Sequence, residues 1–582
     1  MGAGIDRREL VRRLAGLGLT APMVSQLLLS SGPAVAAPAA PYKPAKAGGG
    51  GTLRLLSWQA PTSLNPHFAS GNKDREAARI FYEPLAGWDL DGNLVPQLAA
   101  SLPNRADGTV SADAREVIWT LKKGVTWHDG KPFTAADVVF TAAYASDPDS
   151  ATSTIGSYQR AAFSKIDDHT IRIVFEEATP FWADAFVGVS GMILPEHLFS
   201  GFKGKNSREA PANLAPVGTG PYKFAEFKPG DIVTGVRNPD YHVANQPYFD
   251  AFELKGGGDS VSAARTVLQT GQFDFARDLQ VEDEVLKRLE TGRKGRVEFY
   301  PSGQTEIVVL NTTDPVLEID GERSHPRSQH PTLSDPEVRK AINLLIDRDS
   351  IQKFIHGRAG SATGAFVNQP ERFRSPKLTY EFSIDKANAI LDAAGYARDT
   401  DGIRQKGGKR LKYVFQTTIT GPRQKAQAVI KAACQKAGIE LELKSVTASV
   451  YFSSDIANPD TLKKFYCDIE MHASTGTQPD PQAFLRQFTS WEIAAKDNKW
   501  QGRNFSRFRS DEADELYRSA EKEVDPLARL AQLLRLSEIF VEANVYLPIL
   551  ARNVSVAITN DLVTVPSGWD SDFWNIAAWY KG

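Results

Sequence analysis

The side chains that could take part in catalysis or metal binding lie far apart in this sequence. His128 stands beside Asp129, a base next to a carboxylate, but neighbours on a strand point to opposite faces, so adjacency alone builds no proton relay. His325 and His330 are five residues apart in a loop rich in Pro and Ser. We favour a solvated loop there over the alternative of a metal site. We therefore predict no catalytic residue, no metal and no cofactor in these segments.

Two serines stand in segments with some features of hydrolase motifs. Gly258-Asp259-Ser260 resembles the start of a GDS motif, which normally follows the first strand of its domain. Here the surrounding residues predict a turn and a helix cap instead. The segment Gly188-Val189-Ser190-Gly191 lacks the glycine spacing of a nucleophile elbow. A hydrolase that uses Ser260 is kept as the alternative from another functional class, and we expect the chain not to be an enzyme.

The composition is that of an ordinary soluble globular chain. With 582 residues, of which 42% are hydrophobic, the chain can bury large cores and is long enough for more than one domain. A formal net charge of −2, without a long basic run, argues against nucleic acid or a membrane surface as a partner. The two cysteines, Cys434 and Cys467, lie in apolar surroundings, so buried free thiols and a disulfide both remain open.

The first residues have the pattern of an export signal. Arginines at positions 7, 8, 12 and 13 precede an uncharged run over residues 14–42, whose apolar part is shorter than the roughly 20 residues of a membrane span. Arg7-Arg8-Glu9-Leu10 resembles the twin-arginine export motif, with Asp6 where Ser or Thr is usual. We predict a signal peptide over residues 1–36, a linker over residues 37–51 and a periplasmic location. An anchored helix or a disordered tail is the alternative.

The periodicity of the sequence indicates the elements that position the polar residues. The alternating residues 117–121 predict a strand, and a turn follows at residues 129–130. Thr134 is expected to cap a helix whose first turn carries Asp137, where a carboxylate meets the positive end of the helix dipole. The first strand of the fold is expected at residues 53–58.

Later in the chain the pattern becomes helical. Helices are expected to begin after Asp335, Ser383 and Asp525, and a further helix over residues 423–437 leads into a half-buried strand at residues 439–443. This order of helix and strand indicates an α/β lobe.

These segments contain a series of motifs in the order in which a known family has them. They are the segment 95–137, Pro216-Val217-Gly218-Thr219-Gly220-Pro221-Tyr222, Arg237-Asn238-Pro239-Asp240-Tyr241, Gly271-Gln272-Phe273-Asp274, Asp335-Pro336-Glu337-Val338-Arg339-Lys340-Ala341 with Ile346-Asp347-Arg348, and Asn504-Phe505-Ser506-Arg507-Phe508. Over about residues 52–575 the chain resembles family 5 of the extracytoplasmic solute-binding proteins, the dipeptide, oligopeptide and nickel receptors of bacterial ABC importers.

The resemblance implies an α/β fold, namely the two-lobed clamshell of periplasmic binding proteins (type II, cluster C) with an additional inserted domain. The expected parts are lobe I (residues 52–84, 212–303 and 542–582), the inserted lobe II (residues 85–211) and lobe III (residues 304–541). Hinges near residues 300–303 and 542–548 are expected to join lobes I and III. A ligand that contacts both of these lobes favours the closed state by its extra affinity for that state.

The function implied by the resemblance is that of the substrate-binding component of an ABC importer. Such a protein captures a small solute and delivers it to a membrane permease and ATPase complex, and it is expected to act as a monomer. A short peptide is the expected solute, because peptides are the most frequent ligands of the family. An opine or a sugar derivative is the alternative, and a binder without a transporter also remains open.

The expected ligand contacts come from positions that match relatives. In many peptide-binding relatives, an aspartate three residues before an Asp-Pro pair holds the α-ammonium of the peptide. The corresponding residue here is Thr477, whose hydroxyl cannot neutralise a buried ammonium, and this departure weakens the peptide assignment. Asp480 is an acidic candidate for holding the ammonium instead, although the resemblance implies that its carboxylate caps a helix over residues 482–488. The remaining expected contacts are Trp58, Thr62, Tyr451, Gln478 and Trp491.

Overall fold

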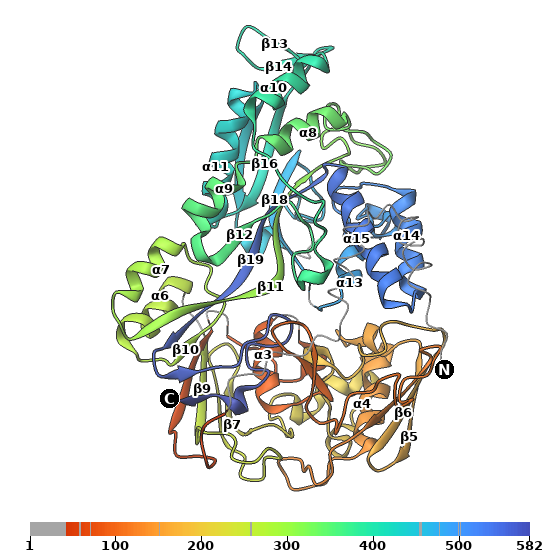
Figure 1. Cartoon of the computed structure of the whole chain (residues 1–582), viewed down its shortest axis with the longest axis vertical. Helices are drawn as coiled ribbons and strands as arrows, with labels where there is room; N and C mark the ends of the chain where they lie inside the picture. The colour runs from red at the N-terminus through yellow and green to blue at the C-terminus, as the bar shows by residue number, and fades with distance from the viewer. Residues whose placement is uncertain are drawn as a thin grey trace. The chain divides into compact units, whose positions relative to one another are not determined.

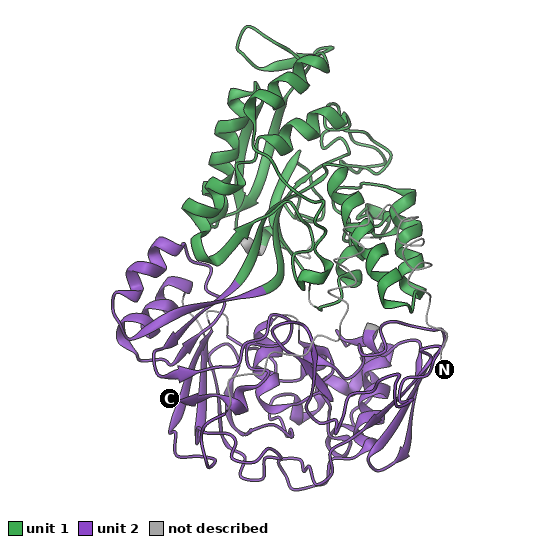
Figure 2. Cartoon of the chain, viewed as in Figure 1, with its two compact units in different colours: residues 1–32, 302–553 green, residues 33–301, 554–582 purple. Residues whose placement is uncertain are grey.

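The computed structural model describes residues 42–57, 60–69, 72–150, 152–256, 259–452, 457–476, 478–498, 500 and 502–582. The predicted signal peptide, Trp58 and Thr477 lie outside these residues. Within the described part of the chain, none of the helices has the length and apolar character needed to cross a membrane. The described residues form two compact units (Figure 2): unit 1 contains residues 302–553, and unit 2 contains residues 42–301 and 554–582.

Unit 2 is built around strands in the order β10-β1-β9-β8-β7. These strands are β1 (Thr52–Ser57), β7 (Tyr222–Lys228), β8 (Ile232–Arg237), β9 (Ala251–Gly256) and β10 (Phe275–Ala276). β1 runs parallel to both of its neighbours, and Leu55 lies in register with Leu254 on one side and Phe275 on the other. All three side chains are buried, so these three neighbouring strands contribute side chains to the core of this unit.

A second, smaller sheet in unit 2 has the order β4-β6-β5 and packs against α4 (Figure 1). These elements are β4 (Glu116–Thr120), β5 (Ala161–Asp167), β6 (Thr170–Phe175) and α4 (Ala135–Ser146). The prediction for the start of α4 is confirmed. The side chain of Thr134 accepts a hydrogen bond from Ala136 N, and the Asp137 carboxylate accepts one from Thr134 N at 2.9 Å.

The remaining elements of unit 2 are short. They are α3 (Asn72–Phe81), β2 (Ala86–Trp88), β3 (Leu94–Pro96), α5 (Glu196–Phe199), α6 (Ser260–Arg265), α7 (Asp283–Glu290), β20 (Leu562–Val563) and β21 (Tyr580–Lys581). Buried charges connect α3 with the segment after β10 and with the segment after β20. Arg277, just after β10, binds Glu76 of α3 at 2.9 Å and Asp572 at 2.7 Å, so it links the N-terminal and C-terminal parts of the unit.

Unit 1 is an α/β unit whose strands follow the order β17-β16-β18-β11-β19, with β12 paired to β19. The strands are β11 (Gly295–Leu310), β12 (Gly360–Ala362), β16 (Lys412–Thr418), β17 (Glu440–Val446), β18 (Ile469–Thr475) and β19 (Tyr546–Thr559). A hairpin-like sheet of β13 (Ala397–Arg398), β14 (Arg404–Lys406) and β15 (Lys409–Arg410) is separate from them.

The helices of unit 1 are α8 (Pro336–Leu344), α9 (Arg348–Ile351), α10 (Ile384–Ala393), α11 (Gly421–Lys436), α12 (Ala448–Tyr451), α13 (Gln482–Arg486), α14 (Asp511–Lys522) and α15 (Pro526–Glu542). In Figure 1, α11 lies along β16 and β17, while α13, α14 and α15 pack together. The predicted N-caps Asp335, Ser383 and Asp525 are confirmed, because each side chain accepts hydrogen bonds from backbone N–H groups of the first helical turn.

The chain passes between the units within two long strands, β11 and β19. The unit boundaries fall at residues 301/302 and 553/554. The first boundary lies inside the segment 300–303 that is expected to be a hinge, and the second lies beyond the expected segment 542–548. The further division of unit 2 into lobes I and II stays a prediction.

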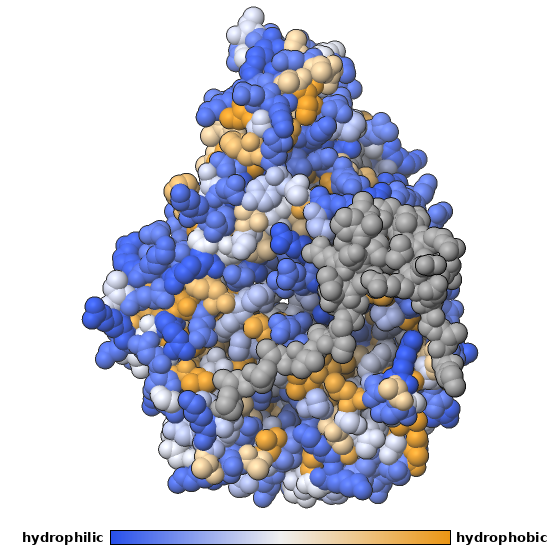
Figure 3. Space-filling view, in the orientation of Figure 1, coloured by the Kyte–Doolittle hydropathy of each residue, from blue (hydrophilic) through white to orange (hydrophobic). Residues whose placement is uncertain are grey.

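The exposed apolar side chains of the described residues are mostly scattered. Figure 3 shows a largely hydrophilic face on which apolar residues appear singly or in small groups. Single exposed apolar side chains, such as Phe354 at 70% exposure, are normal on a protein surface.

Candidate ligand-binding site

The expected contact residues of the described chain lie in different surroundings. In unit 2, Thr62 is exposed, and its backbone N–H donates to Asp74 at 2.7 Å. In unit 1, Tyr451 is fully buried, with its hydroxyl 3.4 Å from Met471 O, while Gln478 is half-buried. Trp491 is 38% exposed.

The aromatic ring of Trp491 is contacted by other side chains of unit 1. Its ring packs edge-on against Tyr517, and the Arg518 guanidinium lies over it at 4.8 Å. A ligand that stacks on the face that Arg518 covers therefore has to displace this guanidinium.

The Asp480 carboxylate is engaged within unit 1. Its Oδ1 accepts hydrogen bonds from Gln482 N and from Arg529 Nη2, both at 2.9 Å, and Arg529 also binds Oδ2. Gln482 is the first residue of α13, which ends at Arg486 and is therefore shorter than predicted. Because a guanidinium already neutralises this carboxylate, Asp480 is poorly placed to take up the ammonium of a ligand. The role of Arg529 was not predicted from the sequence.

A buried cluster of charges in unit 1 was also missed by the sequence analysis. Glu306 of β11 is 3% exposed, and its carboxylate binds Arg423 Nε of α11 at 2.5 Å and Arg552 Nη1 of β19 at 3.6 Å. We call these three residues the Glu306 cluster. A glutamate in the otherwise apolar end of a strand, Thr305-Glu306-Ile307-Val308, was the local signal that could have drawn attention to it.

The Glu306 cluster carries an excess of positive charge. Burial by itself would raise the pKa of Glu306, but Arg423 and Arg552 outweigh burial and hold that pKa at about 2. The nearby His472 has its pKa lowered to about 4 by burial and by Arg423, so it is neutral at pH 7. One carboxylate therefore faces two guanidinium groups, which favours the approach of an anionic group.

The candidate catalytic residues have structural roles in unit 2. The Asp259 carboxylate caps α6 by accepting hydrogen bonds from Val261 N and Ser262 N, as the predicted turn and helix cap require. His128 accepts a hydrogen bond from Gly218 N, while Asp129 contacts His197 instead. The predicted lack of a relay between His128 and Asp129 is thus confirmed.

The expectation of a solvated loop around both histidines is wrong for His330. This side chain is buried, its Nε2 lies 2.9 Å from Asp468 Oδ1, and its Nδ1 accepts a hydrogen bond from Leu333 N. His330 therefore fastens its loop to unit 1. Among the residues that the structure describes, no group of three His, Cys, Asp or Glu side chains is arranged to hold a metal ion.

Both cysteines are buried free thiols. Burial raises the pKa of Cys434 to about 12, and it also raises the pKa of Cys467. Neither sulfur is therefore a reactive thiolate at neutral pH, which settles the alternative that the sequence left open.

Comparison with known proteins gives one consistent result. The model of the bacterial extracellular solute-binding proteins, family 5 (middle region), matches residues 93–495. The oligopeptide-binding protein AppA of Bacillus subtilis is 25% identical over 585 residues, which covers 98% of this chain and 99% of that protein. The glutathione-binding protein GsiB of Pectobacterium atrosepticum is 29% identical over 58% of this chain and 59% of its own.

Solved structures share the fold. The ABC transporter substrate-binding protein CtaP of Listeria monocytogenes superimposes with a TM-score of 0.75 at 22% identity, over 91% of this chain and 99% of its own. The expected α/β fold of a type II periplasmic binding protein is thereby confirmed.

Proposed function

Because the chain belongs to family 5 of the bacterial extracellular solute-binding proteins, we propose that the solute it captures is a short peptide. The chain is the substrate-binding component of an ABC importer, working with a permease and an ATPase, and is not an enzyme. The alignment with an oligopeptide-binding protein over 98% of the chain is the observation that carries the peptide proposal. The glutathione-binding relative also binds a small peptide by its name.

The chain is an exported protein, as the other members of its family are. We propose that it acts as a monomer in the periplasm, after cleavage of the signal peptide behind Ala36. The twin-arginine-like start supports this proposal. N-terminal sequencing of the mature protein from the periplasm tests it, and a chain that still begins at Met1 would contradict it.

The Glu306 cluster supports a solute with a free carboxylate. Two guanidinium groups around one carboxylate leave a positive charge that a terminal carboxylate can neutralise. Short peptides and opines carry such a group, whereas a neutral sugar derivative does not. The proposal therefore assigns Arg552 as a contact for the solute carboxylate. It keeps as further contacts Trp58, Thr62, Tyr451, Thr477, Gln478 and Trp491.

The proposal is tested by purifying the protein from its native periplasm, denaturing it and identifying the released solute by mass spectrometry. A mixture of short peptides supports the proposal. If a single opine is released, the assignment of a carboxylate contact stands but the solute is not a peptide. If a single neutral sugar is released, both the carboxylate contact and the peptide are wrong.

A variant pair tests the carboxylate contact directly. We expect Arg552→Met to weaken binding of a captured peptide about tenfold, and to leave binding of its C-terminal amide nearly unchanged. Lys431→Met is the matched control, because Lys431 is an exposed cation of α11. Calorimetry measures both affinities, and equal losses for acid and amide would remove Arg552 from this role.

Thr477→Asp tests the ammonium end of the solute. If a peptide binds with its amino terminus near this residue, the new carboxylate raises the affinity for peptides with a free amino terminus. Unchanged binding by calorimetry removes Thr477 from the anchor role.

A further inference from the structure

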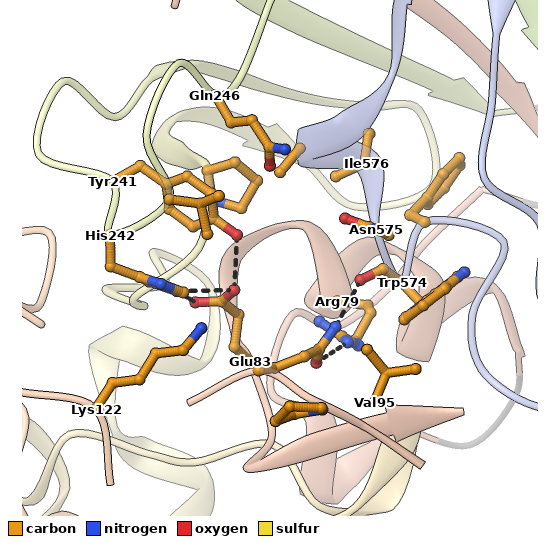
Figure 4. A pocket seen from close by; sticks show the side chains of 16 residues that line it. Arg79, Glu83, Val95, Lys122, Tyr241, His242, Gln246, Trp574, Asn575 and Ile576 are labelled. Carbon is orange, nitrogen blue, oxygen red and sulfur yellow. Dashed lines mark hydrogen bonds and ion pairs between the residues drawn. The ribbon is translucent and has the colours of Figure 1, made fainter. Parts of the chain in front are cut away.

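Unit 2 contains a cavity of about 260 Å³ that none of the expected contact residues lines. Its walls come from the end of α3, the segment of β3, the loop after β8 and the C-terminal segment 573–577 (Figure 4). All of its lining residues belong to unit 2, whereas the Glu306 cluster belongs to unit 1. The cavity therefore has no lining residue in common with the Glu306 cluster.

One set of polar groups in the cavity wall is fully engaged. The Glu83 carboxylate accepts hydrogen bonds from Tyr241 Oη at 2.9 Å and Thr219 Oγ1 at 2.9 Å, and lies 3.0 Å from His242 Nε2. Burial raises the pKa of Glu83, but His242, Arg79 and Thr219 together outweigh burial and hold that pKa at about 2, so the carboxylate is charged. Arg79 binds Gln97 and the backbone oxygen of Tyr82. These groups hold the wall together and have little capacity left for a ligand.

A second set of polar groups is not engaged. Within the described residues, the side chains of Lys122, Gln246 and Asn575 make no hydrogen bond or ion pair, and all three line the cavity (Figure 4). Each is half-buried and comes from a different segment of the chain. Partial burial lowers the pKa of Lys122, because its ammonium has lost part of its hydration, and the charge of Glu83 offsets only part of this effect. Polar groups that are partly withdrawn from water without a hydrogen-bond partner in the protein are unusual, and their convergence on one cavity indicates a binding site.

The chemistry of these groups defines the ligand. Lys122 is a cation that offers hydrogen-bond donors only, while the two amides offer both donors and acceptors. The apolar part of the cavity wall includes Val95, Pro221 and Ile576. At about 30 Å³ for each water-sized group, the cavity holds on the order of nine non-hydrogen atoms. A ligand ammonium would face the like charge of Lys122, while the Glu83 carboxylate is already bound by Tyr241, Thr219 and His242, so a free amine is disfavoured.

We propose that this cavity binds a small organic carboxylate that also carries a neutral hydrogen-bonding group, such as an N-acylated amino acid or a hydroxy acid. Lys122 pairs with the carboxylate, and Gln246 and Asn575 bind the neutral group. This ligand is distinct from the transported solute and binds within unit 2 alone.

The probe for this proposal is N-acetylglycine, with N-acetylglycinamide as its uncharged counterpart. Binding to the full-length mature protein is measured by calorimetry and by ligand-detected NMR. We expect N-acetylglycine to bind and the amide to bind at least tenfold more weakly. No binding of N-acetylglycine at millimolar concentration, or equal binding of the two compounds, overturns the proposal.

Three variants locate the probe. Lys122→Met keeps most of the length of the side chain but removes its charge, and should weaken binding of N-acetylglycine at least tenfold. Lys123→Met removes the exposed neighbouring charge and should change nothing. Asn575→Asp removes the amide donors that bind the neutral group of the ligand and adds a negative charge to the same cavity, so it should also weaken binding of the anion. The unfolding midpoint without ligand confirms that each variant is folded. If N-acetylglycine binds Lys122→Met and Asn575→Asp as it binds the unmodified protein, the probe lies elsewhere and the proposal fails.

Discussion

Replacing Glu306 by glutamine should reveal how much the buried charge cluster of unit 1 contributes to stability. In the folded protein, Arg423 and Arg552 lower the pKa of this carboxyl group from its ordinary value of 4.5 to about 2. A shift of one unit corresponds to 1.36 kcal/mol, so the ionised carboxylate stabilises the folded state by about 3 kcal/mol at pH 7. Glu306→Gln removes this contribution and leaves two guanidinium groups without their shared anion.

The dependence on pH has a definite sign. Since the pKa of Glu306 is lower in the folded state, its contribution is fully present above about pH 4.5 and is lost as the pH falls through about 2. The difference in unfolding free energy between the unmodified protein and Glu306→Gln should therefore be largest at neutral pH and shrink in acid.

The measurement is urea unfolding at pH 7 and at a series of acidic pH values. Hydrogen exchange of the amides in β11 and α11 is used to monitor unit 1 separately. Glu442→Gln is the matched control, because Glu442 is an exposed residue of β17 and surface substitutions usually stay within about 0.5 kcal/mol. A loss below about 1 kcal/mol for Glu306→Gln, or a loss that does not change in acid, would refute the reasoning.

Two further substitutions test the packing of unit 2. Arg277→Met leaves the two buried carboxylates that this residue bridges without a cation, and should lower the unfolding free energy by about 3–5 kcal/mol. Arg288→Met, on the exposed face of α7, should change the unfolding free energy little. Hydrogen exchange in α3 measures both variants, and equal protection of its amides in the two would contradict the bridge. Gly218→Ala places a Cβ 1.8 Å from the backbone oxygen of Phe81 and should lower the free energy of unfolding by about 1–3 kcal/mol, as measured by thermal or urea unfolding. Gly201→Ala is the control, because its Cβ meets nothing within 4 Å and should leave the stability nearly unchanged. A fully stable Gly218→Ala would show that these backbones move apart easily.

Local features of this protein could be predicted because the interactions that produce them lie close together in the sequence. The hydrogen bonds of Thr134 and Asp137 at the start of α4, and of Asp335 at the start of α8, connect residues two or three positions apart. The residue types alone therefore predicted where these helices begin. Element ends were less predictable, and α13 ends two residues before the expected position 488 because no local signal marks its end.

Burial of charged groups was not predictable in this way. In the sequence, His330 has the surroundings of a solvated loop residue. Its hydrogen-bond partner Asp468 lies 138 positions away, and this contact attaches the loop to the rest of unit 1. Arg423 likewise reaches Glu306 across 117 positions. A single sequence can draw attention to a charged residue in a strand such as Glu306, but it does not show which partner that residue has, because the partner depends on which strands become neighbours.

The sequence by itself determined the family, the α/β character, the main helix starts and the absence of a relay between His128 and Asp129, since each of these depends on short segments or on motifs in a given order. Only the tertiary structure decided which charged and polar groups are neutralised and which stay available. It engages Asp480 through Arg529, gives the Glu306 cluster its excess positive charge, and brings Lys122, Gln246 and Asn575 to one cavity. The physical reason is that desolvation and pairing of a charge depend on every segment packed around it, and those segments come from distant parts of the chain.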